Sequence, residues 1–137
     1  MRGTKPILRA IEGGLSDMPP APAWMHPLAK AEWNRVVPGL IERGVLAESD
    51  LGTLESYCVA VGQIRQCEAV LQSEEMFVQS ERSAPRPHPA FRVMHTAQTL
   101  ARQLAAELGL TPASRNKPVK VEGDKADEGG WGDDLLA

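Results

Sequence analysis

The chain has 137 residues, which is enough for one domain with terminal tails. Hydrophobic residues make up 42% of it but aromatic residues only 4%, so Ala, Leu and Val supply the apolar mass and favour packed helices over an aromatic core. A net charge of −3 gives no overall attraction to nucleic acid, so any DNA contact must come from local basic clusters.

Residues 1–25 are predicted to form a basic, proline-rich N-terminal arm. Arg2, Lys5 and Arg9 carry its charge, with no acidic residue among the first nine positions. Three prolines between Met18 and Ala23 then predict an extended connector, because proline fixes φ and removes a backbone donor. No signal peptide and no membrane-spanning run is visible, and we expect a cytoplasmic protein.

Residues 26–116 are predicted to form a helical core. The first helix begins at Pro27, a residue suited to the first helical turn, and ends at Gly44. The second runs from about 50 to 75, with Ser49 or Asp50 as its N-terminal cap. The short connection between these helices predicts a helical hairpin. Cysteines 58 and 67 lie about 13 Å apart along this second helix, too far for a disulfide, so we expect reduced thiols.

Residues 76–88 interrupt the helical pattern. A short extended segment is plausible from Met76 to Gln79, whereas Pro85, Pro87 and Pro89 are expected to prevent regular structure. A third helix follows from about His88 to Leu108, with Gly109 as its C-terminal cap. After it, residues 117–137 form an acidic tail that is expected to be disordered between about 118 and 130.

The sequence lacks a recognisable catalytic or metal-binding set. His26 and His88 each precede a proline at a helix start, and neither they nor His95 have further ligands at metal-site spacing. There is no phosphate-binding loop and no nucleophile with a base at a familiar spacing. Glu32, with the acids at 42 and 55, is assigned to exposed helix faces. We expect no enzymatic activity and no cofactor.

Three short basic clusters could contact phosphates. They consist of Arg2, Lys5 and Arg9; of Arg82, Arg86 and Arg92; and of Arg115, Lys117 and Lys120. Scattered solvated charge is the alternative interpretation of each cluster. The apolar stripes of the helices are thin for a monomer of this size, so self-association is the simplest way to bury them.

An ordered series of segments resembles the P27 family of phage terminase small subunits. Its members include Arg2–Pro6, Pro19–Met25, Ala29–Trp33, Asp50–Cys58, His88–Ala90 and Glu107–Arg115. Two departures are Thr4, where the family often has a basic residue, and the tail after residue 116, which lies outside the resemblance. The resemblance implies a homo-oligomeric ring that binds double-stranded viral DNA and delivers it to the large terminase, the separate ATPase and nuclease, in the cytoplasm of the infected bacterial host.

Residue roles follow as hypotheses. DNA contact is assigned first to Arg2, Lys5 and Arg9 and second to Arg115 and Lys117. Trp131, Leu135 and Leu136 resemble a short peptide that docks on the large subunit, although an idle tail is an equal alternative. The core and the subunit interfaces are assigned to Trp33, Val37, Leu40, Leu54, Val61, Met94, Ala101 and Leu104.

Two other functions remain open from the sequence. One is a small helical DNA-binding regulator, although the second helix has only Arg65 as a basic residue and several acids beside it, which makes a poor recognition surface. The other is a phage structural adaptor that oligomerises without affinity for DNA.

Overall fold

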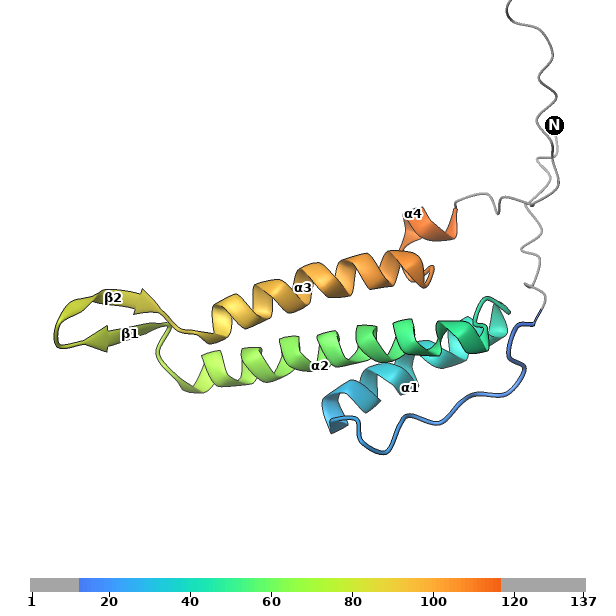
Figure 1. Ribbon diagram of the computed structural model, residues 1–137, viewed down its shortest axis with the longest axis horizontal. Helices are drawn as coiled ribbons and strands as arrows, with labels where there is room; N and C mark the ends of the chain where they lie inside the picture. The colour runs from blue at the N-terminus through green and yellow to red at the C-terminus, as the bar shows by residue number, and fades with distance from the viewer. Residues whose placement is uncertain (1–12, 117–137) are drawn as a thin grey trace, which may run out of the picture.

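The computed structural model describes residues 13–116, and they form three long helices with a small β-hairpin (Figure 1). The elements are α1 (Pro27–Glu42), a 3₁₀ turn (Glu48–Asp50), α2 (Leu51–Ser73), β1 (Phe77–Ser80), β2 (Ser83–Pro87), α3 (Ala90–Glu107) and α4 (Pro112–Arg115). The fold is therefore mostly helical, and the predicted helical hairpin and long third helix are confirmed. The predicted all-α class is corrected by the two strands.

The central helix α2 has α1 against its first half and α3 along its length (Figure 1). At 1.5 Å per residue α1 is about 24 Å long and α2 about 35 Å, so α2 continues past α1. Gly62 permits the close contact between them, because a Cβ there would lie 3.0 Å from the Cβ of Ala29. One end of the molecule therefore has three helices in cross-section and the other has two.

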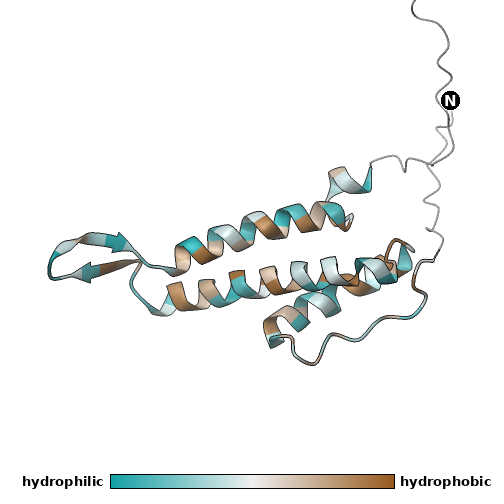
Figure 2. Cartoon of the chain, viewed as in Figure 1, coloured by the Kyte–Doolittle hydropathy of each residue, from teal (hydrophilic) through white to brown (hydrophobic). Residues whose placement is uncertain are grey.

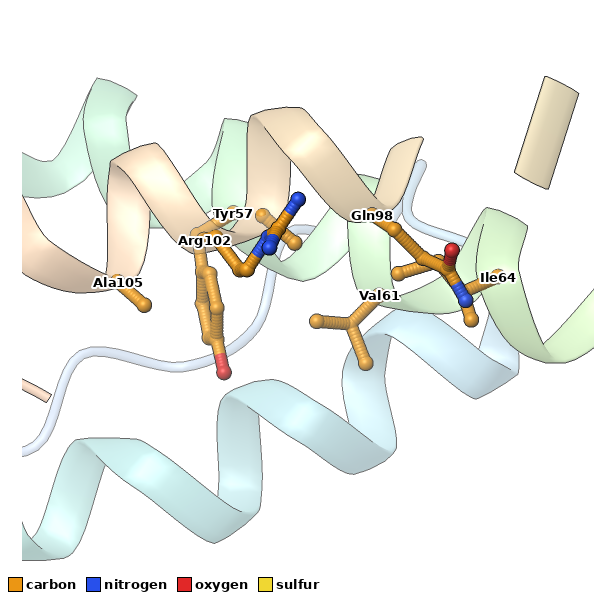
Figure 3. Close-up of a pocket in the computed structure, with 7 residues that line it drawn as sticks. Tyr57, Val61, Ile64, Gln98, Arg102 and Ala105 are labelled. Atoms are coloured by element: carbon orange, nitrogen blue, oxygen red, sulfur yellow. The ribbon is translucent and has the colours of Figure 1, made fainter. Parts of the chain in front are cut away.

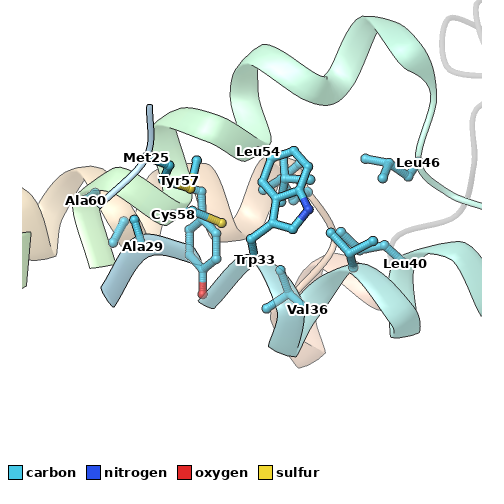
Figure 4. Packing of buried hydrophobic residues seen from close by; sticks show 13 residues of the cluster. Met25, Ala29, Trp33, Val36, Leu40, Leu46, Leu54, Tyr57, Cys58 and Ala60 are labelled. Atoms are coloured by element: carbon cyan, nitrogen blue, oxygen red, sulfur yellow. The ribbon is translucent and has the colours of Figure 1, made fainter. Parts of the chain in front are cut away.

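The core lies at the end of the molecule where α1 covers α2 (Figure 4). Its largest fully buried side chains are Val37 and Leu40 of α1, Leu46 of the connection, and Leu54 and Cys58 of α2. The segment before α1 closes one side of this core. It is held there by a hydrogen bond that the Trp33 indole N–H donates to the Pro19 carbonyl at 2.9 Å. The predicted non-helical connector is thus held against the helices by a specific contact.

Helix boundaries agree with the sequence in most places. Pro27 occupies the first turn of α1, and the left-handed glycines Gly44 (φ 65°) and Gly109 (φ 73°) follow α1 and α3. Asp50 is the N-cap residue of α2, as predicted for Ser49 or Asp50, but its side chain makes no hydrogen bond to the first turn of α2. Its carboxylate instead accepts a hydrogen bond from the Ala47 N–H at 3.0 Å, which closes the preceding 3₁₀ turn.

The prediction that the prolines prevent regular structure is wrong for Pro85 and Pro87, which lie in β2. β1 and β2 pair antiparallel, with Phe77 opposite Pro87 and Val78 opposite Arg86. The His88 N–H donates to the Met76 carbonyl at 2.7 Å. Backbone N–H groups alternate in direction along a strand, so the nitrogen of Pro87 faces away from β1 and its lack of a hydrogen costs no bond in the ladder. Proline is tolerated at such outward positions of an edge strand.

Candidate functional site

A buried carboxylate joins α1 to α2. The side chain of Glu32 is only 2% exposed, and it accepts hydrogen bonds from the Tyr57 hydroxyl at 2.7 Å and from the Arg35 Nε at 2.8 Å. A second nitrogen of Arg35 also donates to it, and Arg65 Nη2 lies 3.9 Å away. The predicted exposed position of Glu32 is therefore wrong.

The charges around this carboxylate determine its ionisation. Burial alone would raise the pKa of Glu32, but the hydrogen bonds from Arg35 and Tyr57 and the positive charges of Arg35 and Arg65 outweigh burial and lower it. Burial and the hydrogen bond to Glu32 raise the pKa of Tyr57 to about 12, so its hydroxyl stays protonated and donates. The side chains of Arg35 and Arg65 are nevertheless more than half exposed at the surface.

A hollow surface lies over α2 between its two neighbours. Its first part, of about 480 Å³, is lined by Tyr57, Val61 and Ile64 of α2 and by α3 residues between Gln98 and Ala105 (Figure 3). Its second part, of about 420 Å³, shares Ile64 and Gln98 and extends to Leu28 of α1. We call the two together the α2 trough. Its floor is mainly apolar, while Arg65, Glu68 and Arg102 stand in its lining.

The β-hairpin extends from the end of the molecule opposite the core (Figure 2). Met76, Phe77 and Val78 are each about half exposed. The hairpin brings Arg86 together with Arg92 around one hollow of about 490 Å³, whereas Arg82 lies in the turn between the strands. The hairpin therefore presents both apolar and basic groups to solvent.

A comparison with protein families decides which class this architecture belongs to. The family described as phage terminase, small subunit, matches residues 29–125, which is more than half of the chain. The chain belongs to the phage terminase small subunit family. Membership implies a role in packaging phage DNA in the host, and small subunits are generally non-catalytic. No curated protein and no solved structure matches the chain.

Only some of the residues assigned to DNA contact in this terminase subunit lie within the described residues 13–116. Arg115 lies exposed in α4, with its Nε 3.4 Å from the Thr111 carbonyl. Arg2, Lys5, Arg9 and Lys117 lie outside residues 13–116, as do the docking candidates Trp131, Leu135 and Leu136. Arg115 is therefore the one assigned DNA contact that lies among the described residues.

The residues assigned to the core and interfaces fall into two groups. Five are buried within this one chain: Trp33, Val37, Leu40, Leu54 and Ala101. Three are only partly buried: Val61, Met94 and Leu104. Val61, Met94 and Ala101 line the α2 trough, and of these Val61 and Met94 are the partly buried ones that a second molecule could still reach.

The histidines and cysteines have structural positions. The Nδ1 atoms of His26 and His88 accept hydrogen bonds from the N–H groups of Leu28 and Ala90, as expected for residues at helix starts. Both cysteines are free and buried, and burial raises the pKa of the Cys58 thiol to about 12. Between residues 13 and 116, no group of three potential metal ligands is present. Within that range no helix is long and apolar enough to cross a membrane.

The feature that the sequence analysis missed is the buried Glu32 with its partners Arg35, Tyr57 and Arg65. Buried α1 residues recur at 29, 32, 33, 36, 37 and 40, so the helical period places position 32 inside the apolar face. A glutamate within such a face requires partners, and Arg35 one turn later is the nearest candidate on the helix. The helical period alone therefore predicts a buried position for Glu32, whereas the polarity of the residue suggested an exposed one.

Proposed function

We propose that the protein assembles into a ring, binds double-stranded viral DNA and presents it to the large terminase subunit. The observation that carries this proposal is the family match over residues 29–125. The structure supports it through the α2 trough and the exposed apolar hairpin, surfaces of a kind that commonly mark contacts with other molecules. In this proposal residues 1–25 are the DNA-binding arm, 26–116 the oligomerisation core and 117–137 a tail for partner docking.

The assembly is tested by light scattering coupled to size-exclusion chromatography at low and moderate salt. We expect one discrete species whose mass is many times the 14.9 kDa of the chain. A monomer or dimer at both salt concentrations would contradict the ring.

DNA contact is proposed for Arg2, Lys5 and Arg9, with Arg115 and Lys117 contributing second. Each phosphate contact adds about 0.9 to the slope of log K against log salt for duplex DNA. Changing the first three residues together to Ala should therefore reduce that slope by up to about 3 per bound subunit, as measured by fluorescence anisotropy across a salt series. An unchanged slope would reject the arm as the contact.

A matched control removes the same number of charges elsewhere. Arg82 and Arg86 in the β-hairpin and Lys30 in α1 lie outside the arm and outside the α2 trough, and changing these three to Ala leaves both intact. We expect the slope of this variant to stay near that of the wild type. An equal loss in both variants would show that general charge, and not the arm, determines binding.

The tail is proposed to dock on the large terminase through Trp131, Leu135 and Leu136. Aromatic and leucine side chains that follow an acidic stretch resemble short peptides that dock on partners. Deleting residues 128–137 should weaken binding to the purified large subunit while leaving oligomer mass and DNA affinity unchanged. Full retention of large-subunit binding would reject this role.

The regulator alternative receives no support from α2. Arg65, the one basic residue of that helix, lies 3.9 Å from Glu32, and both flanking helices pack against α2. A recognition helix needs a free face with several side chains that reach base edges.

A further inference from the structure

The outer side of α3 carries two exposed apolar side chains among polar ones. Val93 is 51% exposed and Leu100, two turns later, is 43% exposed. Thr96, Gln103 and Glu107 are exposed at the positions between and after them. We call these five residues the α3 stripe. The spacing of three and four residues is that of a helix seam that packs against another helix.

The α3 stripe and the α2 trough lie on different sides of α3. Ala97, Ala101 and Leu108 are buried, whereas the trough is lined by Met94, Gln98 and Ala105. At about 100° per residue, the stripe and the trough wall are roughly 170° apart around the helix, with the buried seam between them. One molecule can therefore offer its stripe to a second molecule and receive the stripe of a third.

We propose that the α3 stripe of one copy of this chain packs into the α2 trough of the next copy, head to tail. This inference rests on the proposed self-association and specifies the two surfaces that form it. Because the two surfaces differ, the contact is heterologous, and such contacts generate closed rings when the rotation between neighbours closes. A self-complementary contact would instead stop at a dimer.

The pairing implies a register along the helices. In a ring whose axis runs along α3, neighbouring copies have no axial shift, so equal residue numbers lie at equal heights. The partner's Val93 then lies one residue from the height of Met94, and the partner's Leu100 lies between Gln98 and Ala101 at the centre of the trough. The proposal thus assigns Val93 to the second part of the trough and Leu100 to the first.

The charges fit the same arrangement. The α3 stripe ends with Glu107 and is flanked at its start by Arg92. The trough has Arg102 in its first part, and Glu68 together with Arg65 in its second, near Met94. In register, the partner's Glu107 faces the Arg102 end, about 8 Å away along the axis and within reach of two long side chains, while the partner's Arg92 faces Glu68. The reversed orientation would place the partner's Arg92 at the Arg102 end, where the two charges repel.

Two variants separate the surfaces. Leu100→Glu places a charge on the stripe at a position already exposed to solvent, and Gln98→Trp fills the trough where its two parts meet. Each variant alone should give the 14.9 kDa monomer in light scattering, because every contact needs both surfaces. Val70→Glu is the matched control, since Val70 is another exposed apolar side chain that lies outside both surfaces.

Mixing the two variants is the decisive experiment. The intact stripe of Gln98→Trp can enter the intact trough of Leu100→Glu once, so the mixture should give a dimer of twice the chain mass and nothing larger. Circular dichroism and thermal melting check that each variant is folded, and Arg102→Glu serves as a second trough variant if Gln98→Trp does not fold.

The outcomes distinguish this inference from the proposed function. A wild-type protein that is itself monomeric contradicts the proposed ring. A wild-type ring that survives both Leu100→Glu and the folded trough variant, or a mixture that stays monomeric, overturns the assignment of these surfaces while the ring stands. Loss of assembly in Val70→Glu as well would place the contact elsewhere and overturn it too.

Discussion

At the end of α2 where α1 crosses it, Leu54 and Cys58 have no exposed surface, and residues 13–26 and both neighbouring helices cover them. At the other end every residue from 72 to 87 is exposed, including the apolar side chains of β1. One helix therefore joins a packed region to a region with no core of its own. A two-stranded hairpin is at best marginally stable alone in water, so the distal end depends on α2 and α3 for its position.

This difference indicates how stability and contact surfaces are distributed. Substitutions at the covered end should act on the free energy of unfolding, because they remove buried contacts or hydrogen bonds. Substitutions at the distal end should leave that free energy nearly unchanged. The comparison can be tested along α2 and its neighbours with single changes.

The largest effect is expected at Leu54. Leu54→Ala removes a fully buried side chain from the contact between α1 and α2 and should lower the free energy of unfolding by about 2–5 kcal/mol. Urea denaturation followed by circular dichroism measures the change. A loss below about 1 kcal/mol would show that this end relaxes around the cavity and is not tightly packed.

The next effect is expected at Glu32. Glu32→Gln keeps the size of the side chain but removes its negative charge, which weakens the hydrogen bonds from Tyr57 and Arg35. We expect a loss of about 1–3 kcal/mol at neutral pH, measured by the same denaturation. An increase in stability would show that the desolvation cost of burying the charge exceeds the stabilisation from its hydrogen bonds and ion pairs.

Acid should act through the same carboxylate. The pKa of Glu32 is lowered in the folded protein from its ordinary value of 4.5, so its contribution to stability is fully present above 4.5. That contribution is lost as pH falls from 4.5 through the folded-state pKa. The wild type should therefore lose more stability below pH 4.5 than Glu32→Gln does. Parallel curves for the two proteins would exclude Glu32 as a source of the acid sensitivity.

The helices were predictable because their signals are local. Pro27, Gly44 and Gly109 mark boundaries through backbone geometry that the residue type itself dictates. The apolar periods of α1 and α3 likewise indicated Trp33 and Ala101 as core positions, and both are buried. These features need no knowledge of the partner helix.

The remaining features depend on pairing across the fold. The prolines of β2 are compatible with a strand only because their positions face away from β1, which the sequence of β2 alone does not state. Glu32 is buried because Tyr57, 25 positions later, lies against it. The trough also required the register of α2 against α3. Predicted contacts in residues 1–12 and 117–137 lie outside the described residues and stay predictions.

A smaller effect is expected at the junction of the two regions. The His88 Nδ1 accepts from the Ala90 N–H at 3.0 Å, while its Nε2 lies 2.6 Å from Glu74, which links the start of α3 to the end of α2. His88→Ala removes both contacts and should cost about 1 kcal/mol, as the loss of a helix-start acceptor commonly does. His88→Asn, which retains a short acceptor, should recover part of this in thermal melts. Equal losses in the two variants would assign the effect to the Glu74 contact.

The smallest effect is expected at Val78 in β1. This side chain is half exposed and faces Arg86 across the hairpin, so Val78→Ser removes little buried surface and should change the free energy of unfolding by no more than about 0.5 kcal/mol. Measured beside Leu54→Ala, it compares two apolar residues that differ mainly in burial. A loss above about 1 kcal/mol in the assembled protein but not in the Leu100→Glu monomer would show that the hairpin is covered by a neighbouring copy. The same loss in both would show that the hairpin packs within its own chain, and the contrast between the two ends of α2 would then be wrong.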